Sequence, residues 1–319
     1  MIISPEAPKV SILIPVYNRV KLIDECVQSA LDQTYSNFEV VVVDNASDDG
    51  TWEICKQLAL QDSRVRVFRN NSNIGPVRNW RRCVEEAKGE FSKILFSDDT
   101  LEPDCLAEMV LTLEDPDVSL VYCAAKIGTS KQQAGISYSL GEQVRLDSLE
   151  FVNLILWGRA PVSPGAILIR TKDLLANLKT DFPTATPRAF DRHGAGPDVM
   201  ISLLTAKNYR YVLHIPAPLV YFRSHEGSFS VSNVGNHVQQ GYKSALSFYL
   251  FTDIARMSWI RYLADNWLRE MKGRRQWVQP KKYLIQYEGS GSVSEQFLLI
   301  FFSILRPLAR FFGKKSSYI

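Results

Sequence analysis

Several features that would place this sequence in a class at once are missing from it. No apolar run approaches the roughly 18–20 residues that a membrane span needs, and the N-terminal MIISPEAPKV has no basic segment followed by an apolar core. We therefore expect neither a transmembrane helix nor a signal peptide. Only five cysteines occur and none forms a C-x-x-C pair, which predicts buried, reduced thiols in a cytoplasmic protein.

The common nucleotide-binding and catalytic fingerprints are absent as well. No G-x-G-x-x-G follows the first apolar run, and no G-x-x-x-x-G-K-[ST] loop occurs, which excludes the main dinucleotide-binding and P-loop classes. The sequence also lacks a G-x-S-x-G nucleophile elbow and any His/Cys cluster with zinc spacing.

The composition is that of a folded protein with an uneven distribution of charge. With 46% hydrophobic and 22% charged residues, 319 residues are enough for about two globular domains. The net charge of +3 does not indicate a nucleic-acid partner. Residues 269–319, however, contain ten basic and three acidic residues, which favours contact with an oppositely charged surface such as anionic lipid.

The first 125 residues alternate strand-like and helix-like patterns. We expect Asn18 to cap the first helix. The apolar runs predict strands at 10–15, 38–44, 65–68, 92–96 and 118–123, and the periodic segments between them predict helices. Because these runs are continuously apolar, the strands should be buried on both faces, as in a parallel sheet flanked by helices.

Polar clusters follow four of these strands. They are Tyr17-Asn18, Asp44-Asn45, Asn70–Gly75 and Ser97-Asp98-Asp99. In an open α/β sheet the ligand crevice lies beyond the carboxyl ends of the strands, so these clusters should share one site.

Two of the clusters contain carboxylates with a possible chemical role. Asp98 and Asp99 suit a hard divalent cation that also holds phosphate oxygens, although paired aspartates are common turn residues too. Asp44 could accept from a pyrimidine imide or a ribose hydroxyl. The alternative for the segment after Asp44 is an Asx-turn and a helix cap.

Four motifs in order resemble the nucleotide-sugar-binding half of inverting family 2 glycosyltransferases with the GT-A fold. They are Pro15-Val16-Tyr17-Asn18, VVDNASDDGT, Asn73–Asn79 and LFSDDTLEP, and they span roughly residues 9–125. The resemblance continues more loosely through Gly196-Pro197-Asp198 and the segment ending in Arg223-Ser224-His225. It implies a GT-A sheet, Rossmann-like and mostly parallel, with helices on both sides.

The resemblance also implies roles for individual residues. The donor would bind at the strand ends, with the metal beside the diphosphate and a carboxylate base facing the acceptor. The donor-binding set is Pro15, Val16, Tyr17, Asn18, Asp44, Asn73, Arg78, Ser97 and Asp98. Asp44 would read the pyrimidine, Asp98 and His225 would bind Mn²⁺ or Mg²⁺, with Asp99 as a further metal candidate, and Asp198 would be the catalytic base.

Two positions depart from the family pattern. The signature commonly reads D-x-D-D, but Phe96 stands where the first carboxylate is usual, and Asp99 is the residue that could compensate. Pro197 stands in place of the usual glutamate before the base.

The remainder of the chain is less regular. We expect residues 126–235 to complete the acceptor side, 236–272 to be helical, 278–294 to be a linker, and 295–312 to form a final helix interrupted at Arg306-Pro307. Phe297, Ile300 and Phe301 repeat at helical spacing, which predicts an amphipathic helix in the plane of a membrane surface. The alternative is a helix docked on its own domain or on a partner.

The sequence thus predicts a nucleotide-sugar-binding part (1–125), an acceptor-side part (126–235) and C-terminal helices (236–319). The predicted activity is metal-dependent, inverting transfer from a UDP- or dTDP-sugar to a glycan or lipid-linked acceptor in cell-surface polysaccharide assembly. Such an enzyme would lie on the inner face of the cell membrane. A nucleotidyltransferase and a catalytically inactive scaffold remain the alternatives.

Overall fold

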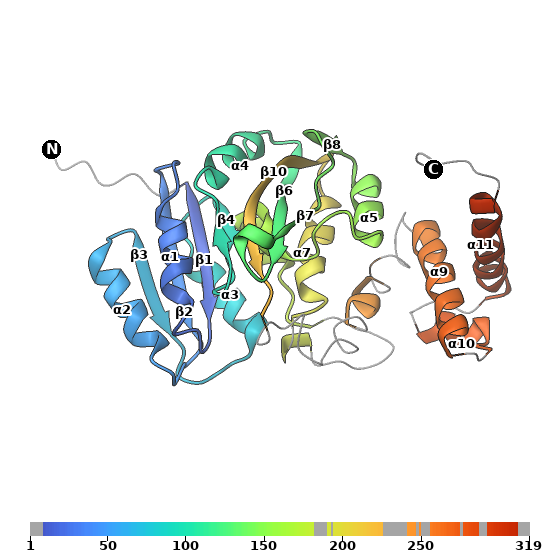
Figure 1. Cartoon of the computed structure of the whole chain (residues 1–319), viewed down its shortest axis with the longest axis horizontal. Helices are drawn as coiled ribbons and strands as arrows, with labels where there is room; N and C mark the ends of the chain where they lie inside the picture. Colours follow the sequence, from blue (N-terminus) through green and yellow to red (C-terminus); the bar gives the residue numbers. More distant parts are fainter. Residues whose placement is uncertain are drawn as a thin grey trace. The chain divides into compact units, whose positions relative to one another are not determined.

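The computed structural model describes residues 9–181, 190–192, 194–225, 241–246, 249, 256–274, 277–286 and 292–311. These residues belong to two compact units (Figure 1). The first contains the described residues up to 225, and the second contains those from 241 onward. The boundary expected between 235 and 236 lies outside the described residues.

The N-terminal half of the sheet consists of four parallel strands. In the order β3-β2-β1-β4, these are β3 (Val65–Arg69), β2 (Phe38–Asp44), β1 (Val10–Val16) and β4 (Phe91–Ile94). Every residue of β1 and β2 is buried. These strands are therefore continuously apolar because both faces of the sheet are buried there, as predicted.

Helices cover the two faces of this half. Val10, Ile12 and Ile14 alternate along β1 and pack in one core with helices α1 (Ile23–Leu31), α2 (Thr51–Gln61) and α4 (Cys105–Leu113). Helix α3 (Pro76–Glu86) contacts β1 and β2 but contributes no residue to that core. We infer that α3 covers the opposite face.

The second half of the sheet is mixed. β9 (Ile167–Arg170) lies antiparallel between β4 and β6 (Val118–Gly128), and β10 (Tyr211–Arg223) runs parallel to β6. Because β6 crosses residue 125, the segments before and after the boundary expected there share one continuous sheet. The other elements of this half are β5 (Thr100–Leu101), β7 (Gly135–Ser137), β8 (Val144–Leu146), α5 (Ser148–Leu156), α6 (Thr171–Asn177), α7 (Pro197–Ala206) and the short 3-10 helices η1 (Lys131–Gln133), η2 (Pro164–Ala166) and η3 (Phe190–Arg192).

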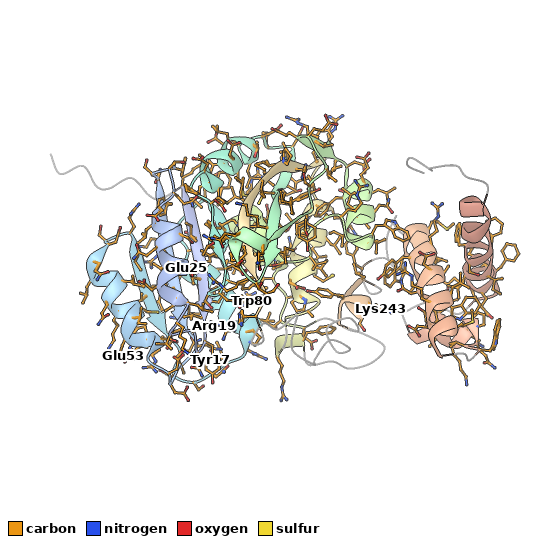
Figure 2. All side chains as sticks on the ribbon, in the orientation of Figure 1. Tyr17, Arg19, Glu25, Glu53, Trp80 and Lys243 are labelled. Atoms are coloured by element: carbon orange, nitrogen blue, oxygen red, sulfur yellow. The ribbon has the colours of Figure 1, made fainter. Side chains whose placement is uncertain are left out.

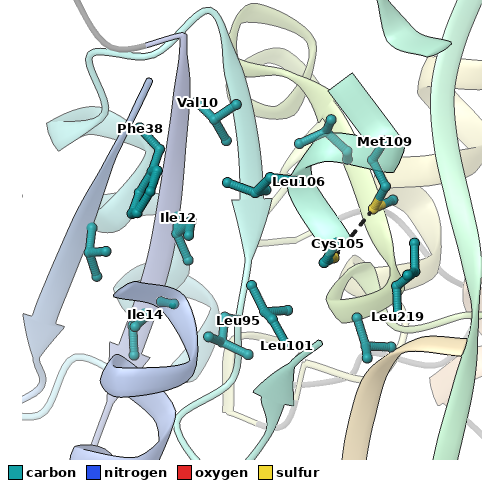
Figure 3. Packing of buried hydrophobic residues seen from close by; sticks show 14 of the residues in the cluster. Val10, Ile12, Ile14, Phe38, Leu95, Leu101, Cys105, Leu106, Met109 and Leu219 are labelled. Atoms are coloured by element: carbon teal, nitrogen blue, oxygen red, sulfur yellow. Dashed lines mark hydrogen bonds between the residues drawn. The ribbon is translucent and has the colours of Figure 1, made fainter. Parts of the chain in front are cut away.

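The core on the face covered by α1, α2 and α4 contains four of the five cysteines, which are Cys26, Cys55, Cys105 and Cys123. Cys105 donates from Sγ to Sδ of Met109 at 3.7 Å, and Leu106 packs beside β1 (Figure 3). All five cysteines are free and buried, as predicted. Burial raises the pKa of the Cys105 thiol to about 12.

Three local predictions are wrong. Asn18 does not cap α1: the N-cap is Leu22, and Asn18 has a left-handed φ of 51° and bonds the β2–α2 loop. The expected linker at 278–294 contains helix α10 (Pro280–Gln286). Helix α11 (Val293–Phe311) confirms the final helix expected at 295–312, but it continues without the expected interruption at Arg306-Pro307.

The second unit contains helix α9 (Arg256–Arg274) together with α10 and α11. Trp259, Trp267 and Tyr283 are buried and belong to the core of this unit. Helix α11 contacts α9 and buries Leu299, while the side chain of Phe297 remains 65% exposed. No helix in the described part of the chain is long and apolar enough to cross a bilayer.

Candidate active site

The loop after β1 is tied to the loop after β2. The backbone N–H of Asn18 donates to Oγ of Ser47 at 2.9 Å, and its side-chain Nδ2 donates to Oδ1 of Asp48 at 2.9 Å. The N–H of Asp48 donates back to Oδ1 of Asn18 at 3.1 Å. Tyr17 lies beside this clamp with 40% of its surface exposed, so its ring is available to a ligand (Figure 2).

Asp44 is fully buried at the end of β2 and already has partners. Its Oδ2 lies 3.1 Å from Nε of Arg69, and both carboxylate oxygens accept from the N–H of Ser47 at 3.2 and 3.3 Å. Arg69 also donates to the Ser47 carbonyl at 2.7 Å. The structure thus gives Asp44 a role in folding the β2–α2 loop, and its contact with a pyrimidine stays a prediction.

Asn45, which follows Asp44, organises the next predicted cluster. Its Oδ1 accepts from the N–H of Ile74 at 3.0 Å, and its Nδ2 donates to Oδ1 of Asn73 at 2.8 Å. Asn73, Ile74, Gly75, Pro76 and Arg192 line an open hollow of about 420 Å³ at the start of α3. Arg78 is exposed in the first turn of the same helix.

Asp98 and His225 meet in the fold, although 127 residues separate them. The imidazole Nε2 lies 3.0 Å from Oδ2 of Asp98, and the two side chains are only 27% and 19% exposed. Arg19 approaches the same oxygen, with Nη2 at 3.8 Å. The structure therefore brings together the two residues predicted to bind a metal and adds a third group.

Asp99 has a different environment from Asp98. Its Oδ1 accepts from the backbone N–H of Arg223 at 2.9 Å, which fastens the end of β10 to the loop after β4. Burial, together with the neighbouring charge of Asp98, raises the pKa of the Asp99 carboxyl well above its usual value. Ser97, the preceding donor-site candidate, is also buried.

The donor atoms at Asp98 suit a divalent cation. A carboxylate oxygen and an imidazole nitrogen at 3.0 Å are ligand types that Mn²⁺ accepts, and Mg²⁺ prefers the oxygen. Within the described residues no group of three or more such side chains could hold a metal ion. The described residues would thus supply two ligands, Asp98 and His225, and the donor or water could fill other positions.

Asp198 is positioned by the first turn of α7. Its Oδ1 accepts from the N–H of Gly196 at 2.8 Å and from that of Val199 at 2.7 Å, and the residue is buried. These bonds satisfy N–H groups that a helix N-terminus leaves without intrahelical partners, and they fix the orientation of the carboxylate.

A packing contact connects the segment before Asp198 to the loop after β4. Gly194 has a φ of +72°, and a Cβ there would lie 2.4 Å from Cη2 of Trp80. The Trp80 ring packs on Phe96, with centroids 5.3 Å apart, and Phe96 directly precedes Ser97. An aromatic contact thus takes the place of the first carboxylate of the usual signature.

Comparison with known protein families shows which family the chain belongs to. The model of glycosyl transferase family 2 matches residues 11–174, which is about half of the chain and includes the strand ends described above. The chain belongs to glycosyl transferase family 2. The predicted family and the predicted fold class are both confirmed.

Curated relatives of this family 2 chain match a little more than a third of it. Glycosyltransferase GlyG of Streptococcus pneumoniae is 34% identical over 112 residues, which is 35% of this chain and 37% of GlyG. The putative glycosyltransferase EpsH of Bacillus subtilis is 38% identical over 119 residues, or 37% and 34% of the two chains. The matches therefore span little more than a third of the length of these relatives.

A solved structure is similar over nearly the whole chain. The structure of S. aureus TarS 1–349 in complex with UDP-GlcNAc superposes with a TM-score of 0.57, covering 98% of this chain and 94% of that one. The sequence identity is 18%, so the likeness concerns the fold.

Four residues of the site were not found from the sequence of this family 2 chain. Arg19, Glu25 and Trp80 have no predicted role, and the sequence allows either a phosphate contact or a structural ion pair for Arg223. The structure pairs Arg223 with Glu25 at 2.6 Å. Of these four residues, only Arg19 could have been recognised from the sequence as a site candidate, because it directly follows the Tyr17-Asn18 cluster at a strand end.

Proposed function

We propose that this chain is a metal-dependent, inverting glycosyltransferase that uses a nucleoside-diphosphate sugar. The observation that supports this most directly is the 3.0 Å contact between Asp98 and His225. These side chains are 127 residues apart in the sequence, and they meet beside Arg19 in the loop after β1. A stabilising role alone would not require a carboxylate and an imidazole to face each other in a part-exposed position.

The proposed reaction is a single displacement at the anomeric carbon. The acceptor oxygen forms a bond to C1 while the bond from C1 to the diphosphate oxygen breaks, which inverts the configuration and releases the nucleoside diphosphate. A divalent cation held by Asp98 and His225 would neutralise the charge of this leaving group. Asp198 would take the proton of the acceptor hydroxyl, since its carboxylate is oriented by two N–H groups.

A UDP or dTDP donor is consistent with the exposed ring of Tyr17 and with the hollow at the start of α3. A stacking ring and an amide-lined loop suit a pyrimidine nucleotide. TarS has been crystallised with UDP-GlcNAc, which supports a donor of this type. Membership of a glycosyltransferase family argues against the nucleotidyltransferase alternative.

The acceptor is proposed to be a glycan or lipid-linked saccharide in cell-surface polysaccharide assembly. The relatives include a putative teichuronic acid biosynthesis glycosyltransferase of B. subtilis, 34% identical over 103 residues, and a hyaluronan synthase of Pasteurella multocida, 40% identical over 120 residues. Both names point to polymer synthesis.

The test is release of nucleoside diphosphate from a panel of UDP- and dTDP-sugars, with acceptor glycans and with or without Mn²⁺. We expect Asp98→Asn and Asp198→Asn to abolish transfer, with Asp198→Asn still binding UDP. Asp117→Asn, at an exposed turn before β6, is the matched control. Unchanged transfer in both site variants would refute the roles of Asp98 and Asp198. Absence of transfer by the unaltered chain would identify a scaffold, and release of pyrophosphate would identify a nucleotidyltransferase.

We also propose that the second unit contacts an anionic membrane on the cytoplasmic side. Trp277, Phe297 and Phe301 are 70%, 65% and 42% exposed, and Lys281 and Lys282 are exposed on α10. Exposed aromatic rings next to basic side chains suit the boundary between headgroups and acyl chains. Part of α11 is docked within its own unit, because Leu299 is buried.

Flotation with liposomes containing phosphatidylglycerol tests this surface. Point changes are preferable to truncation after Ser294, which would remove the buried Leu299 from its contact with the rest of the unit. We expect Phe297→Ser with Phe301→Ser to move the protein to the unbound fraction. Leu111→Ser, at a 76% exposed apolar position in the first unit, should not. Equal binding of all three proteins would rule the surface out.

A further inference from the structure

Two groups that can bear positive charge approach one oxygen of Asp98. His225 places Nε2 3.0 Å from Oδ2, and Arg19 places Nη2 3.8 Å from the same atom. His225 can bind a metal when its imidazole is neutral, but the guanidinium of Arg19 stays protonated in proteins and cannot be a metal ligand. The proposed metal site therefore already contains a permanent cation.

Resting on the proposed function, we propose that Arg19 is the counter-cation of Asp98 in the metal-free protein. A divalent cation displaces it from Asp98, and Arg19 then binds the diphosphate of the donor. The guanidinium would in this way move between the carboxylate and the substrate, and its charge would be compensated in both states.

The backbone of Arg19 is anchored to another loop, whereas its guanidinium donates one short hydrogen bond, to the carbonyl of the neighbouring residue. The backbone N–H donates to Oγ1 of Thr51 at 2.8 Å, and the residue before it is clamped by Ser47 and Asp48. The guanidinium donates from Nη1 to the Asn18 carbonyl at 3.0 Å, and the side chain is 29% exposed. At 3.8 Å its contact with Asp98 is longer than a hydrogen bond, so its departure breaks no hydrogen bond to the carboxylate.

Exchange follows from the charges involved. A divalent cation on Oδ2 of Asp98 would lie within a few ångströms of the guanidinium, where charges of the same sign repel strongly. The diphosphate that accompanies the cation offers the oxygens that a planar guanidinium binds best. Displacement of Arg19 by the metal and its capture by phosphate are therefore coupled.

Arg223, the other arginine beside Asp98, cannot exchange in the same way. Its Nε donates to the Asp98 carbonyl at 3.1 Å, its Nη2 donates to Glu25 at 2.6 Å, and its backbone N–H donates to Asp99. Three bonds to three different residues hold Arg223 in place, whereas Arg19 contacts Asp98 loosely.

The test measures metal and nucleotide binding to the full chain separately from activity. Free Mn²⁺ is followed by electron paramagnetic resonance without nucleotide, and UDP binding is followed by calorimetry at saturating Mn²⁺. We expect Arg19→Gln to bind Mn²⁺ alone about three- to tenfold more tightly, since one repelling charge is gone. The same variant should bind UDP about tenfold more weakly, since a charge-assisted phosphate contact is lost.

Two further variants separate charge from shape. Arg19→Lys keeps the charge but not the planar fork, so its Mn²⁺ affinity should match that of the unaltered protein while UDP binding weakens. Lys21→Gln removes an exposed positive charge two residues away and should change neither value.

Opposite changes in the two affinities of Arg19→Gln would support the exchange. Mn²⁺ affinity that is unchanged or lower in Arg19→Gln, absence of Mn²⁺ binding in both proteins, or unchanged UDP affinity would overturn it. Failure of the proposed function is a separate result, namely the absence of sugar transfer by the unaltered chain, and it leaves the binding comparison interpretable.

Discussion

The ion pair between Asp44 and Arg69 gives the sharpest stability prediction. Asp44 is fully buried, and its Oδ2 lies 3.1 Å from Nε of Arg69, whose side chain is 40% exposed. Replacing Arg69 with Met removes the cation from a buried carboxylate, which keeps the hydrogen bonds from the N–H of Ser47. Asp44→Asn removes the charge instead and keeps an oxygen that can accept the Ser47 bond.

The expected magnitude follows from the burial of the two partners. Removing one member of a fully buried pair costs about 3–5 kcal/mol, and exposed pairs contribute about 0.2–1 kcal/mol. One buried and one part-exposed partner place Arg69→Met between these limits, at a loss of about 1–3 kcal/mol in the free energy of unfolding. The coupling energy in a double-mutant cycle with Asp44→Asn should be about 1–2 kcal/mol.

Urea unfolding of the four proteins of this cycle provides the measurement. The control cycle uses Arg64 and Asp62, whose 2.7 Å pair has both side chains part-exposed and should couple by less than about 1 kcal/mol. A coupling near zero for Asp44 and Arg69, together with a large loss of UDP affinity in the folded Asp44→Asn protein, would refute the structural role. Asp44 would then be a donor-binding residue, as the family resemblance implies.

Two further predictions concern the backbone before α7 and a buried histidine. Gly194→Ala places a Cβ 2.4 Å from Trp80 at a φ of +72° and should lower the unfolding free energy by about 2–3 kcal/mol. The control Gly141→Ala, where φ is also positive but the space is open, should lower it by about 1 kcal/mol. Equal losses for the two variants in urea titrations would contradict the clash. Burial lowers the pKa of His214, so its contribution to stability is complete above about pH 6.5 and falls as the pH decreases through the lower folded value. Unfolding measured from pH 8 to pH 5 should therefore show a smaller loss in His214→Gln than in the unaltered chain; identical slopes would contradict this.

The strands were predictable because their apolar runs reflect burial on both faces. The range predicted at 38–44 coincides with β2, and every residue of that strand is buried. Short helices and loop roles were less predictable. Asn18 has the composition of a helix cap but bonds a different loop, and the segment with glycine and serine at 278–294 contains the helix α10. Local propensity does not distinguish these outcomes, since tertiary contacts decide them.

In the candidate site, too, some features were predictable from the sequence and others depended on tertiary contacts. Position along the chain was enough to predict that polar residues after β1, β2 and β4 gather at one edge, because parallel strands point their carboxyl ends the same way. Position along the chain was not enough to predict that Asp44 would form an ion pair with Arg69, or that Phe96 would pack on Trp80. Those contacts join residues far apart in the sequence or on different elements, and no local pattern encodes them.

The sequence by itself determined the alternation of strands and helices, the family, and the set of carboxylates and imidazoles available for chemistry. These depend on residue type and on spacing over a few turns of chain. Only the tertiary structure decided that His225 and Arg19 share one oxygen of Asp98, that Asp99 fastens β10, and that Asp198 is held by the first turn of α7. Such pairings arise when distant segments pack, and their distances depend on the whole sheet rather than on any one motif.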